Sequence, residues 1–475
     1  MATTQDYVLT AHLMRRAGFG ASWPEIERLS GQNYEQIVEE LLHPEDRPPV
    51  DEFLLYRYHP TTELPGGNVA QGQANYLFHM INTPRPLEEK LALFWHQVFA
   101  TGNNKVDNCN HLIDQIQMFR DHGMGNYRDM LLRIARDPAM IFWLDNQENH
   151  KYAPNENWGR ELLELFSMGV GTYSETDVFE ASRAFTGWTV SAKMPRFPYG
   201  RFPWSFEFRP EDHDEGDKTF LGHTGNLNGD DIIDIVVEQP ACHRFIARHL
   251  YNFFVADEPQ VPAWQIEEPR DPAAVDAIAR VFVESNLEIK PVLRFILNSD
   301  FFKSEAVRFQ RVKSPAEVVV GTVNMIDEFK GPVPYLEIDL SRQAGYMGQD
   351  ILDPPSVEGW HTGKEWINSG SLVARINFVA GMVSNPEHKG VRDIIDRVVA
   401  EPAAASPEGL VDSTLKYMGM VEVGDDTRRE LVEYARGASP IAVNEGGNGS
   451  GNGSGDAAVM EMMSLIAATR EYQFC

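Results

Sequence analysis

The chain of 475 residues contains only three cysteines, Cys109, Cys242 and Cys475, and they lie far apart. No Cys-x-x-Cys pair and no Cys/His finger spacing occurs, so neither a disulfide scaffold nor a structural zinc site is indicated. No stretch approaches the ~20 apolar residues that a membrane-spanning helix needs, which argues against membrane insertion. A basic segment followed by an apolar one is also missing from the N-terminal region, so no signal peptide is predicted. We therefore expect a cytoplasmic protein, or an exported one if a leader has been removed.

Positive charge is scarce as well, because 42 Lys and Arg face 70 Asp and Glu, which gives a formal net charge of −28. This excess of acid argues against nucleic-acid binding, which depends on Lys and Arg that neutralise phosphates. It also argues against docking on an anionic membrane surface and favours a cationic or neutral partner. The contents of hydrophobic residues (43%) and charged residues (24%) are those of an ordinary core-forming protein.

Several familiar functional motifs are missing too. The sequence has no Gly-x-Gly-x-x-Gly fingerprint, no Walker loop and no Gly-x-Ser-x-Gly elbow. It also has no His-Glu-x-x-His zinc motif and no EF-hand loop. The common dinucleotide, nucleotide, serine-hydrolase and zinc-protease sites are therefore not indicated.

The pattern that dominates the chain is helical. Residues 87–100 place their apolar side chains within one arc of a helix with 3.6 residues per turn. The same periodicity predicts helices over 110–122, 126–136, 156–168, 175–187, 230–238, 240–255, 273–285, 290–298, 314–326, 371–383 and 456–470. Ser174, followed by Asp177, is a start signal of the capping-box kind. We therefore predict a mostly α fold, one large multi-helical domain with a small irregular or β insertion near 188–225.

The same reasoning divides the chain into two portions. Residues 1–385 are expected to form the main helical domain, which includes a Pro-, Gly- and aromatic-rich loop insertion at 188–228. Residues 386–475 are expected to form a C-terminal helical portion that packs back on the main domain. A Gly/Ser/Asn tract at 445–455 has no side chains to pack and resembles a flexible linker.

The first candidate site lies on the predicted helix 156–168 and just before it. One side of this helix carries Asn157, Arg160, Glu161 and Glu164. Two carboxylates at i and i+3 are suited to metal binding or to dividing the roles of acid and base. The alternative is an ordinary solvated face on which Arg160 and Glu164 form an i, i+4 ion pair. Asn155 precedes the helix and belongs to the same polar set.

Three further regions hold candidate residues. His96 lies opposite the apolar arc of its helix, where it is either a ligand or proton carrier or a histidine hydrogen-bonded between helices. The loop 209–226 gathers His213, Asp214 and Lys218, which form either a divalent-metal site or a solvated acidic loop. Trp360 lies in a rigid loop and either forms a platform for a sugar or cation or fills the core.

Long blocks of the chain, which contain all these candidates, resemble one known family. The blocks are 13–29, 86–101, 154–188, 213–226, 311–321 and 347–378, together with the ending EYQFC. In order and content they are similar to the bacterial family called domain of unknown function 1800. The resemblance covers nearly the whole chain and favours a shared buried polar network over a solvated face.

The resemblance implies little about activity, because members of the family are uncharacterised. Many are exported, and their genes often neighbour those of domain of unknown function 1501, a family that resembles sulfatases and alkaline phosphatases. A protein partner of that kind is therefore implied. The family's usual FWHNHF segment reads FWHQVF in this chain, so Val98 replaces a second histidine beside His96.

Two hypotheses follow from the sequence. The first and preferred one is a binding or assembly protein that acts with a partner encoded nearby. The second is a metal-assisted hydrolase or oxidoreductase with a polar pocket. In the second, the catalytic set is Glu161, Glu164, His96, His213 and Asp214. A divalent metal would draw its ligands from His96, Glu161, Glu164 and His213. The residues that orient the substrate or an anion would be Arg160, Lys218, Asn155, Asn157 and Trp360.

Overall fold

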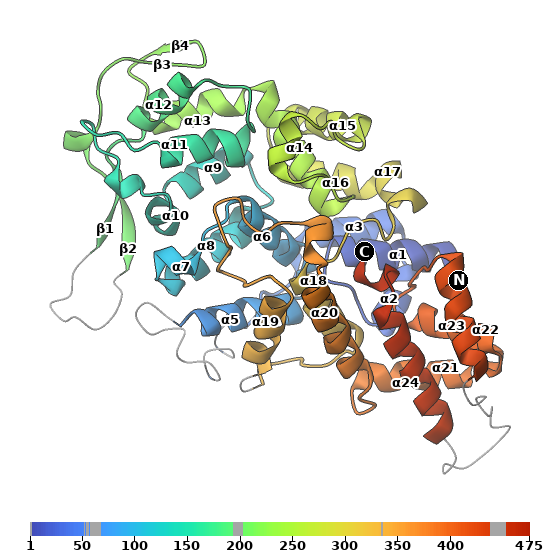
Figure 1. Cartoon of the computed structure of the whole chain (residues 1–475). Coiled ribbons are helices and arrows are strands. Elements are labelled where there is room, and N and C mark those ends of the chain that lie inside the picture. Colours follow the sequence, from blue (N-terminus) through green and yellow to red (C-terminus); the bar gives the residue numbers. More distant parts are fainter. Residues whose placement is uncertain are drawn as a thin grey trace.

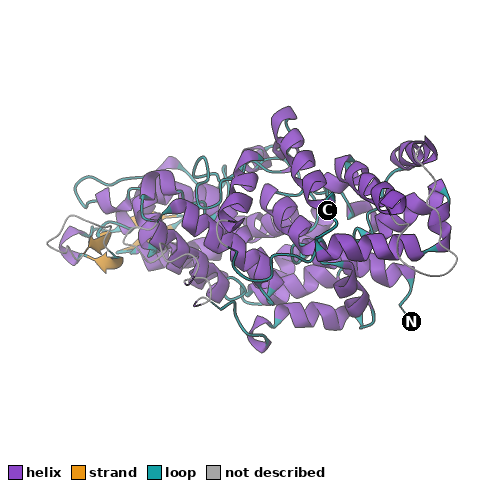
Figure 2. Ribbon diagram, turned by 90° about the horizontal axis from the view of Figure 1, so that it is seen from below, coloured by secondary structure: helices purple, strands orange, loops and turns teal. Residues whose placement is uncertain are grey.

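A computed structural model shows an elongated helical protein with small β-hairpins at one end (Figures 1 and 2). The structure describes residues 2–51, 53, 57, 68–192, 203–333, 336–437 and 453–475. In this part of the chain helices dominate and the strands form only two antiparallel two-stranded sheets. The predicted mostly α fold is therefore confirmed.

The part of the chain before the hairpins forms helices that the apolar periodicity predicted only in part. Those before the hairpins are α1 (Thr4–Arg16), α2 (Trp23–Ser30), α3 (Tyr34–Leu42), α5 (Val69–Asn82), α6 (Pro86–Val98), α7 (Asn103–Val106), α8 (Cys109–His122), α9 (Tyr127–Ala135), α10 (Pro138–Trp143), α11 (Asn157–Glu161) and α12 (Glu175–Ala184). Helix α12 starts as predicted, because the Ser174 hydroxyl accepts from the Asp177 backbone and the Asp177 carboxylate accepts from the Ser174 backbone.

The predicted β insertion consists of two hairpins. Strand β1 (Trp188–Ala192) pairs with β2 (Trp204–Phe208), and Trp188 lies opposite Phe208. Strand β3 (Lys218–Phe220) pairs with β4 (His223–Gly225). The Phe220 side chain is buried, so the second hairpin is fixed to the core by an aromatic ring, as the aromatic content of this loop predicted.

Of the twelve described helices after the hairpins, seven follow predicted ranges to within three residues, and the five at 300–303, 336–346, 389–400, 407–417 and 425–437 were not predicted. The twelve are α13 (Gly229–Val237), α14 (Pro240–Phe254), α15 (Pro272–Glu284), α16 (Ile289–Asn298), α17 (Asp300–Lys303), α18 (Pro315–Met325), α19 (Leu336–Tyr346), α20 (Ser369–Val383), α21 (Lys389–Ala400), α22 (Pro407–Tyr417), α23 (Asp425–Gly437) and α24 (Gly453–Ala468). Most of the predicted linker 445–455 lies outside the described residues, and its last three residues already belong to α24.

The C-terminal helices lie against the first helices of the chain, at the end of the molecule opposite the hairpins (Figures 1 and 2). Helix α24 packs on α20, α21 and α22. Beyond it, an antiparallel bridge joins Phe474 to Val312, and Cys475 exchanges backbone hydrogen bonds with Arg311. A single large apolar cluster extends from Ala11 in α1 to Tyr472 near the end of the chain. The two portions therefore share one core.

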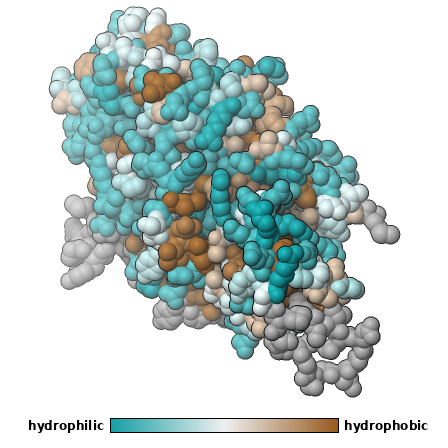
Figure 3. Space-filling model, turned by 45° about the vertical axis from the view of Figure 1, so that its right-hand side comes forward, coloured by the Kyte–Doolittle hydropathy of each residue, from teal (hydrophilic) through white to brown (hydrophobic). Residues whose placement is uncertain are grey.

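The face that Figure 3 shows is mostly hydrophilic, with one gathered hydrophobic patch near the middle of the view and smaller ones elsewhere. None of the helices in the described part of the chain is long and apolar enough to cross a membrane.

Candidate functional site

The predicted helix 156–168 is split into two kinds of helix. Helix α11 ends at Glu161, and the chain continues as one wider π-helical turn, η4 (Leu162–Ser167). In that turn the Met168 N–H donates to the Leu163 carbonyl, five residues back, and the Ser167 hydroxyl donates to the Leu162 carbonyl. Such turns are rare and occur frequently at functional sites. Glu164 lies within this turn, three residues after Glu161.

Glu161 and Glu164 form the carboxylate pair that the sequence indicated. Burial, reinforced by the negative charge of Glu164, raises the pKa of the Glu161 carboxyl to about 7, although Arg160 acts in the opposite direction. The exposed Glu358 adds a smaller contribution that also raises it. The Tyr173 hydroxyl donates to Glu164 Oε2 over 3.4 Å. We call this pair of carboxylates the acidic recess, and its Glu161 carboxyl takes up a proton near neutral pH.

The solvated-face alternative predicted an i, i+4 ion pair between Arg160 and Glu164. This pair does not occur among the described residues. The guanidinium binds Glu156 over 3.1 Å and Glu175 over 2.7 Å instead. Within the described residues, neither Glu161 nor Glu164 has a cation at ion-pair distance.

The acidic recess borders an apolar groove. A cavity of about 380 Å³ is lined by Glu164, Leu165, Val170, Phe245, Trp264 and neighbouring residues. Its two arginines already have acidic partners, because Arg244 pairs with Glu268 and Asp276 and Arg248 pairs with Glu258. The free charge at this groove is therefore negative.

His96 and Trp360 belong to the core. The Leu352 N–H donates to His96 Nε2 over 3.2 Å, and the Trp360 ring lies edge-on with its centroid 5.1 Å away. Burial lowers the pKa of His96 to about 3, so the imidazole stays neutral. Trp360 packs with Trp366 and Phe474 in a small second cluster and is almost completely buried. Both residues therefore fit the core alternative rather than that of a ligand or platform.

The candidate residues of the loop 209–226 bind groups within the loop, in α12 and just after α12. His213 is buried with Nδ1 2.8 Å from the Thr186 carbonyl oxygen. Asp214 forms an ion pair with Arg183 over 2.7 Å. The ammonium of Lys218 donates to the carbonyl oxygens of Asp214 and Gly216, and burial lowers its pKa. These polar groups satisfy one another, which is typical of a structural network.

The two asparagines that precede and begin α11 act in the same way. The Asn155 N–H donates to Asn149 Oδ1 over 2.9 Å, and the Asn157 N–H donates to Asn155 Oδ1 over 2.9 Å. The Asn157 amide also donates to Asp145 over 3.2 Å. They hold the start of α11 against the preceding loop.

The four proposed metal ligands do not form one site. His96 is enclosed with Trp360, His213 binds the carbonyl of Thr186, and the two glutamates lie together at the acidic recess. Across the part of the chain that the structure describes, no group of three or more His, Cys, Asp or Glu side chains is placed to hold a metal ion.

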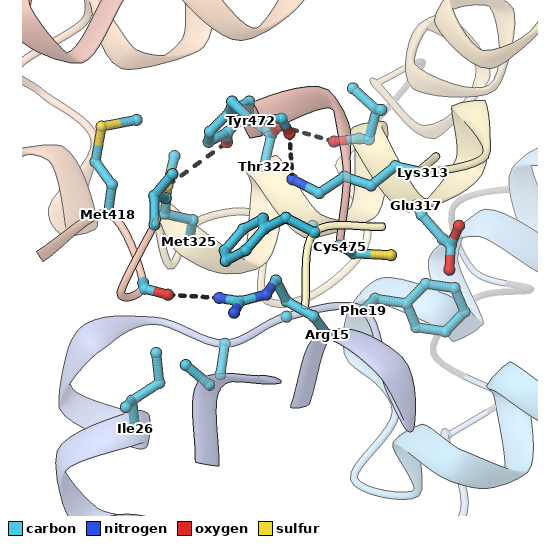
Figure 4. Close-up of a pocket in the computed structure, with 18 residues that line it drawn as sticks. Arg15, Phe19, Ile26, Lys313, Glu317, Thr322, Met325, Met418, Tyr472 and Cys475 are labelled. Carbon is cyan, nitrogen blue, oxygen red and sulfur yellow. Dashed lines mark hydrogen bonds between the residues drawn. The ribbon is translucent and has the colours of Figure 1, made fainter. Parts of the chain in front are cut away.

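A second polar region was missed by the sequence reasoning (Figure 4). Glu317 of α18 is buried, and its carboxylate accepts from Lys90 and, over 2.7 and 2.8 Å, from Arg311. Arg16 donates to the sulfur of Cys475 over 3.1 Å. The signal was present, since two adjacent arginines, Arg15 and Arg16, occur in an otherwise apolar part of α1.

Comparison with protein families supports the resemblance that the sequence showed. No curated protein and no solved structure matches the chain. The model of the family described as Protein of unknown function (DUF1800) matches residues 12–474, from α1 to the C-terminal segment that closes the core. The chain therefore belongs to the DUF1800 family.

Proposed function

We propose that the protein is a binding or assembly protein, and that the acidic recess of Glu161 and Glu164 with its adjoining groove receives a basic and apolar segment of a partner protein. The observation that carries this proposal is the pair of carboxylates without a cationic partner among the described residues, beside an apolar groove. A Lys or Arg side chain of the partner would supply the missing charge, and its apolar neighbours would fill the groove.

The remaining polar residues of the family blocks support binding rather than chemistry. The hydrogen bonds and ion pairs of His213, Asp214 and Lys218 are made within the protein itself. The imidazole of His96 is neutral and enclosed. The net charge of −28 attracts a cationic partner and speeds its association. The resemblance described above suggests the partner's class, a protein of the sulfatase-like domain of unknown function 1501 encoded by a neighbouring gene.

The test is capture of that neighbouring gene product by the tagged full-length protein. The double variant Glu161→Gln/Glu164→Gln removes both charges while keeping the side-chain shape. We expect its dissociation constant to be at least tenfold weaker, and the wild-type affinity to fall as salt is raised. The matched control is Glu430→Gln/Glu433→Gln, an exposed pair with the same i, i+3 spacing on α23. Equal capture by both double variants would reject the proposed surface.

A second candidate function rests on one observation, the pKa of about 7 at Glu161 beside Glu164. A carboxyl that titrates near neutral pH is suited to general acid–base catalysis in a hydrolase. Two carboxylates with no cation are also a usual protein contribution to a Mg²⁺ or Mn²⁺ site that is completed by substrate phosphates. Titration of the purified protein with Mn²⁺ tests this alternative. Stoichiometric binding that disappears in Glu161→Gln but persists in His213→Ala would favour the enzyme.

A further inference from the structure

The missed polar region encloses a small cavity between the two ends of the chain. It holds about 50 Å³ and lies between α1, α18, the turn at 418–421 and the C-terminal segment (Figure 4). This space is several times what one water needs, and a small ion would fit it. Much of its wall is apolar, with Phe19, Phe309, Met325, Met418 and Tyr472 among the lining residues.

Two cationic side chains line this cavity without a carboxylate partner among the described residues. Arg15 donates Nη1 to the Gly419 carbonyl and lies 4.6 Å from the centre of the Phe309 ring, while its Nε and Nη2 atoms are buried and donate to nothing. Lys313 donates to the Tyr472 carbonyl over 2.7 Å and lies 4.1 Å from the centre of that ring. Buried guanidinium nitrogens without a partner are unusual, because water or an acceptor normally satisfies them.

Further cations stand directly behind this wall. Arg375 is completely buried, donates Nη1 to the Lys313 carbonyl and leaves Nε and Nη2 without a partner. Arg16, Lys90 and Arg311 surround Glu317 and the sulfur of Cys475.

Negative charge reaches this region from Glu317, from the buried Asp257 beside Arg311 and Arg16, from Glu422 near Arg15 and from the sulfur of Cys475. Among the described residues, however, no carboxylate forms an ion pair with Arg15 or Lys313. Glu317 is the one side-chain carboxylate among the described residues that line the cavity, and Lys90 and Arg311 already bind it. Burial lowers the pKa of Arg15 to about 10 and that of Lys313 to about 8. Burial works to raise the pKa of the Cys475 thiol, but Arg16, Arg311 and Lys90 outweigh it and lower that pKa. This interior therefore holds more cationic than anionic side chains.

We infer that this cavity, which we call the Arg15 cavity, is a binding site for a small oxyanion of the phosphate or sulfate class. The free Nε and Nη2 donors of Arg15 match two oxygens of such an ion, and the Lys313 ammonium adds a point charge. The aromatic and methionine walls exclude water and so strengthen the attraction. A bound dianion would supply Arg15 and Lys313 with the ion-pair partner that they lack among the described residues. This site is separate from the acidic recess, where an anion would be repelled.

The test is equilibrium dialysis of the full-length protein with labelled inorganic phosphate at constant ionic strength. We expect saturable binding of one phosphate per chain, competition by sulfate and none by chloride. Arg15→Gln keeps a polar side chain and should weaken binding at least tenfold. The matched control is Arg28→Gln, an arginine whose pair with Glu25 is exposed, and it should bind within twofold of the wild type.

A second variant and a second measurement guard against a folding defect in Arg15→Gln. Lys313→Gln removes the other lining cation and should also weaken binding. Phosphate should raise the melting temperature of the wild type above that in chloride of equal ionic strength, and the shift should vanish in either variant that folds. The absence of saturable binding by the wild type would overturn the inference, and so would unchanged binding by a folded Arg15 or Lys313 variant.

Discussion

Glu317 is the residue on which two buried cations depend, and its removal is the sharpest stability test of the core. Both Lys90 and Arg311 bind its carboxylate inside the protein. We predict that Glu317→Gln destabilises the fold by about 3–5 kcal/mol, because two buried charges lose their partner. Urea unfolding measures this. Glu25→Gln breaks an exposed pair with Arg28 and should cost at most about 1 kcal/mol. Similar losses for both variants would contradict the view that the Glu317 network is energetically important.

Glu161 makes stability depend on pH in a direction opposite to that of a typical ion-paired acid. Its pKa in the folded protein is about 7, above the ordinary value of 4.5. Unfolding therefore releases a proton between these two values, and the free energy of unfolding falls as the pH rises through that window. Glu161→Gln should be more stable than the wild type by about 1–2 kcal/mol at pH 8, since solvent screens part of the effect, and should show no gain at pH 4.

The control for this pH effect is Glu430→Gln, an exposed glutamate, for which the difference from the wild type should stay flat between pH 4 and pH 8. Thermal unfolding of both variants across the range provides the measurement. A Glu161→Gln difference that does not change with pH would mean that the carboxyl is already ionised at pH 5. A more stable Glu161→Gln variant would show that the wild type loses stability by keeping this carboxylate, as proteins often do at functional sites.

At the scale of elements, the contact between α11 and α12 depends on a single glycine. A Cβ atom at Gly159 would lie 2.4 Å from Ser182 Oγ and 3.1 Å from the Val178 carbonyl oxygen, so α11 cannot approach α12 with a side chain there. We predict that Gly159→Ala destabilises the protein by about 1–3 kcal/mol through overpacking. It should also displace Glu161, two residues further on, and so weaken partner capture.

Gly381 in α20 is the matched control, because nothing lies within 4 Å of the position of its Cβ. Gly381→Ala should stabilise the protein by about 0.5–1 kcal/mol, the usual gain of alanine over glycine in a helix. Differential scanning calorimetry of both variants measures the two signs. A stable Gly159→Ala protein would show that α11 and α12 can separate without cost.

The elements also show what the sequence could and could not reveal. Apolar periodicity predicted α6, α14 and α18 to within one or two residues, because burial of one face fixes that pattern. It could not predict the π turn η4, because the shift of the backbone hydrogen bonds from four to five residues back leaves no mark on the apolar pattern. Glu161 and Glu164 lie close enough for one charge to act on the other, because residues three apart on a helix are neighbours. The Arg15 cavity was missed because α1, α18 and the last residues meet only through the tertiary fold.

At the scale of the whole molecule, the two ends of the chain are joined into one structure. The backbone of Cys475 pairs with that of Arg311, Phe474 bridges to Val312, and Arg16 of the first helix donates to the sulfur of Cys475. The network around Glu317 thus draws on α1, α6, α18 and the C-terminal segment at once. Cationic charge is concentrated in this interior, while the surplus of acid is left to the rest of the protein and its surface. An acidic protein therefore contains a positive centre, and the two proposed sites attract ligands of opposite charge.

The contacts between the two ends of the chain predict how the molecule unfolds. Because α24 packs on α20, α21 and α22, and because residues 473–475 hydrogen-bond to 311–313, residues 386–475 cannot leave without exposing the core of the first portion. We predict one cooperative thermal transition for the whole chain, with a calorimetric enthalpy close to the van't Hoff enthalpy. A fragment of residues 1–385 should show no cooperative transition, since the Arg15 cavity would lose Tyr472 and Cys475 and its cations would lie open. Two separate transitions, or a fragment that melts cooperatively, would instead establish two independent domains.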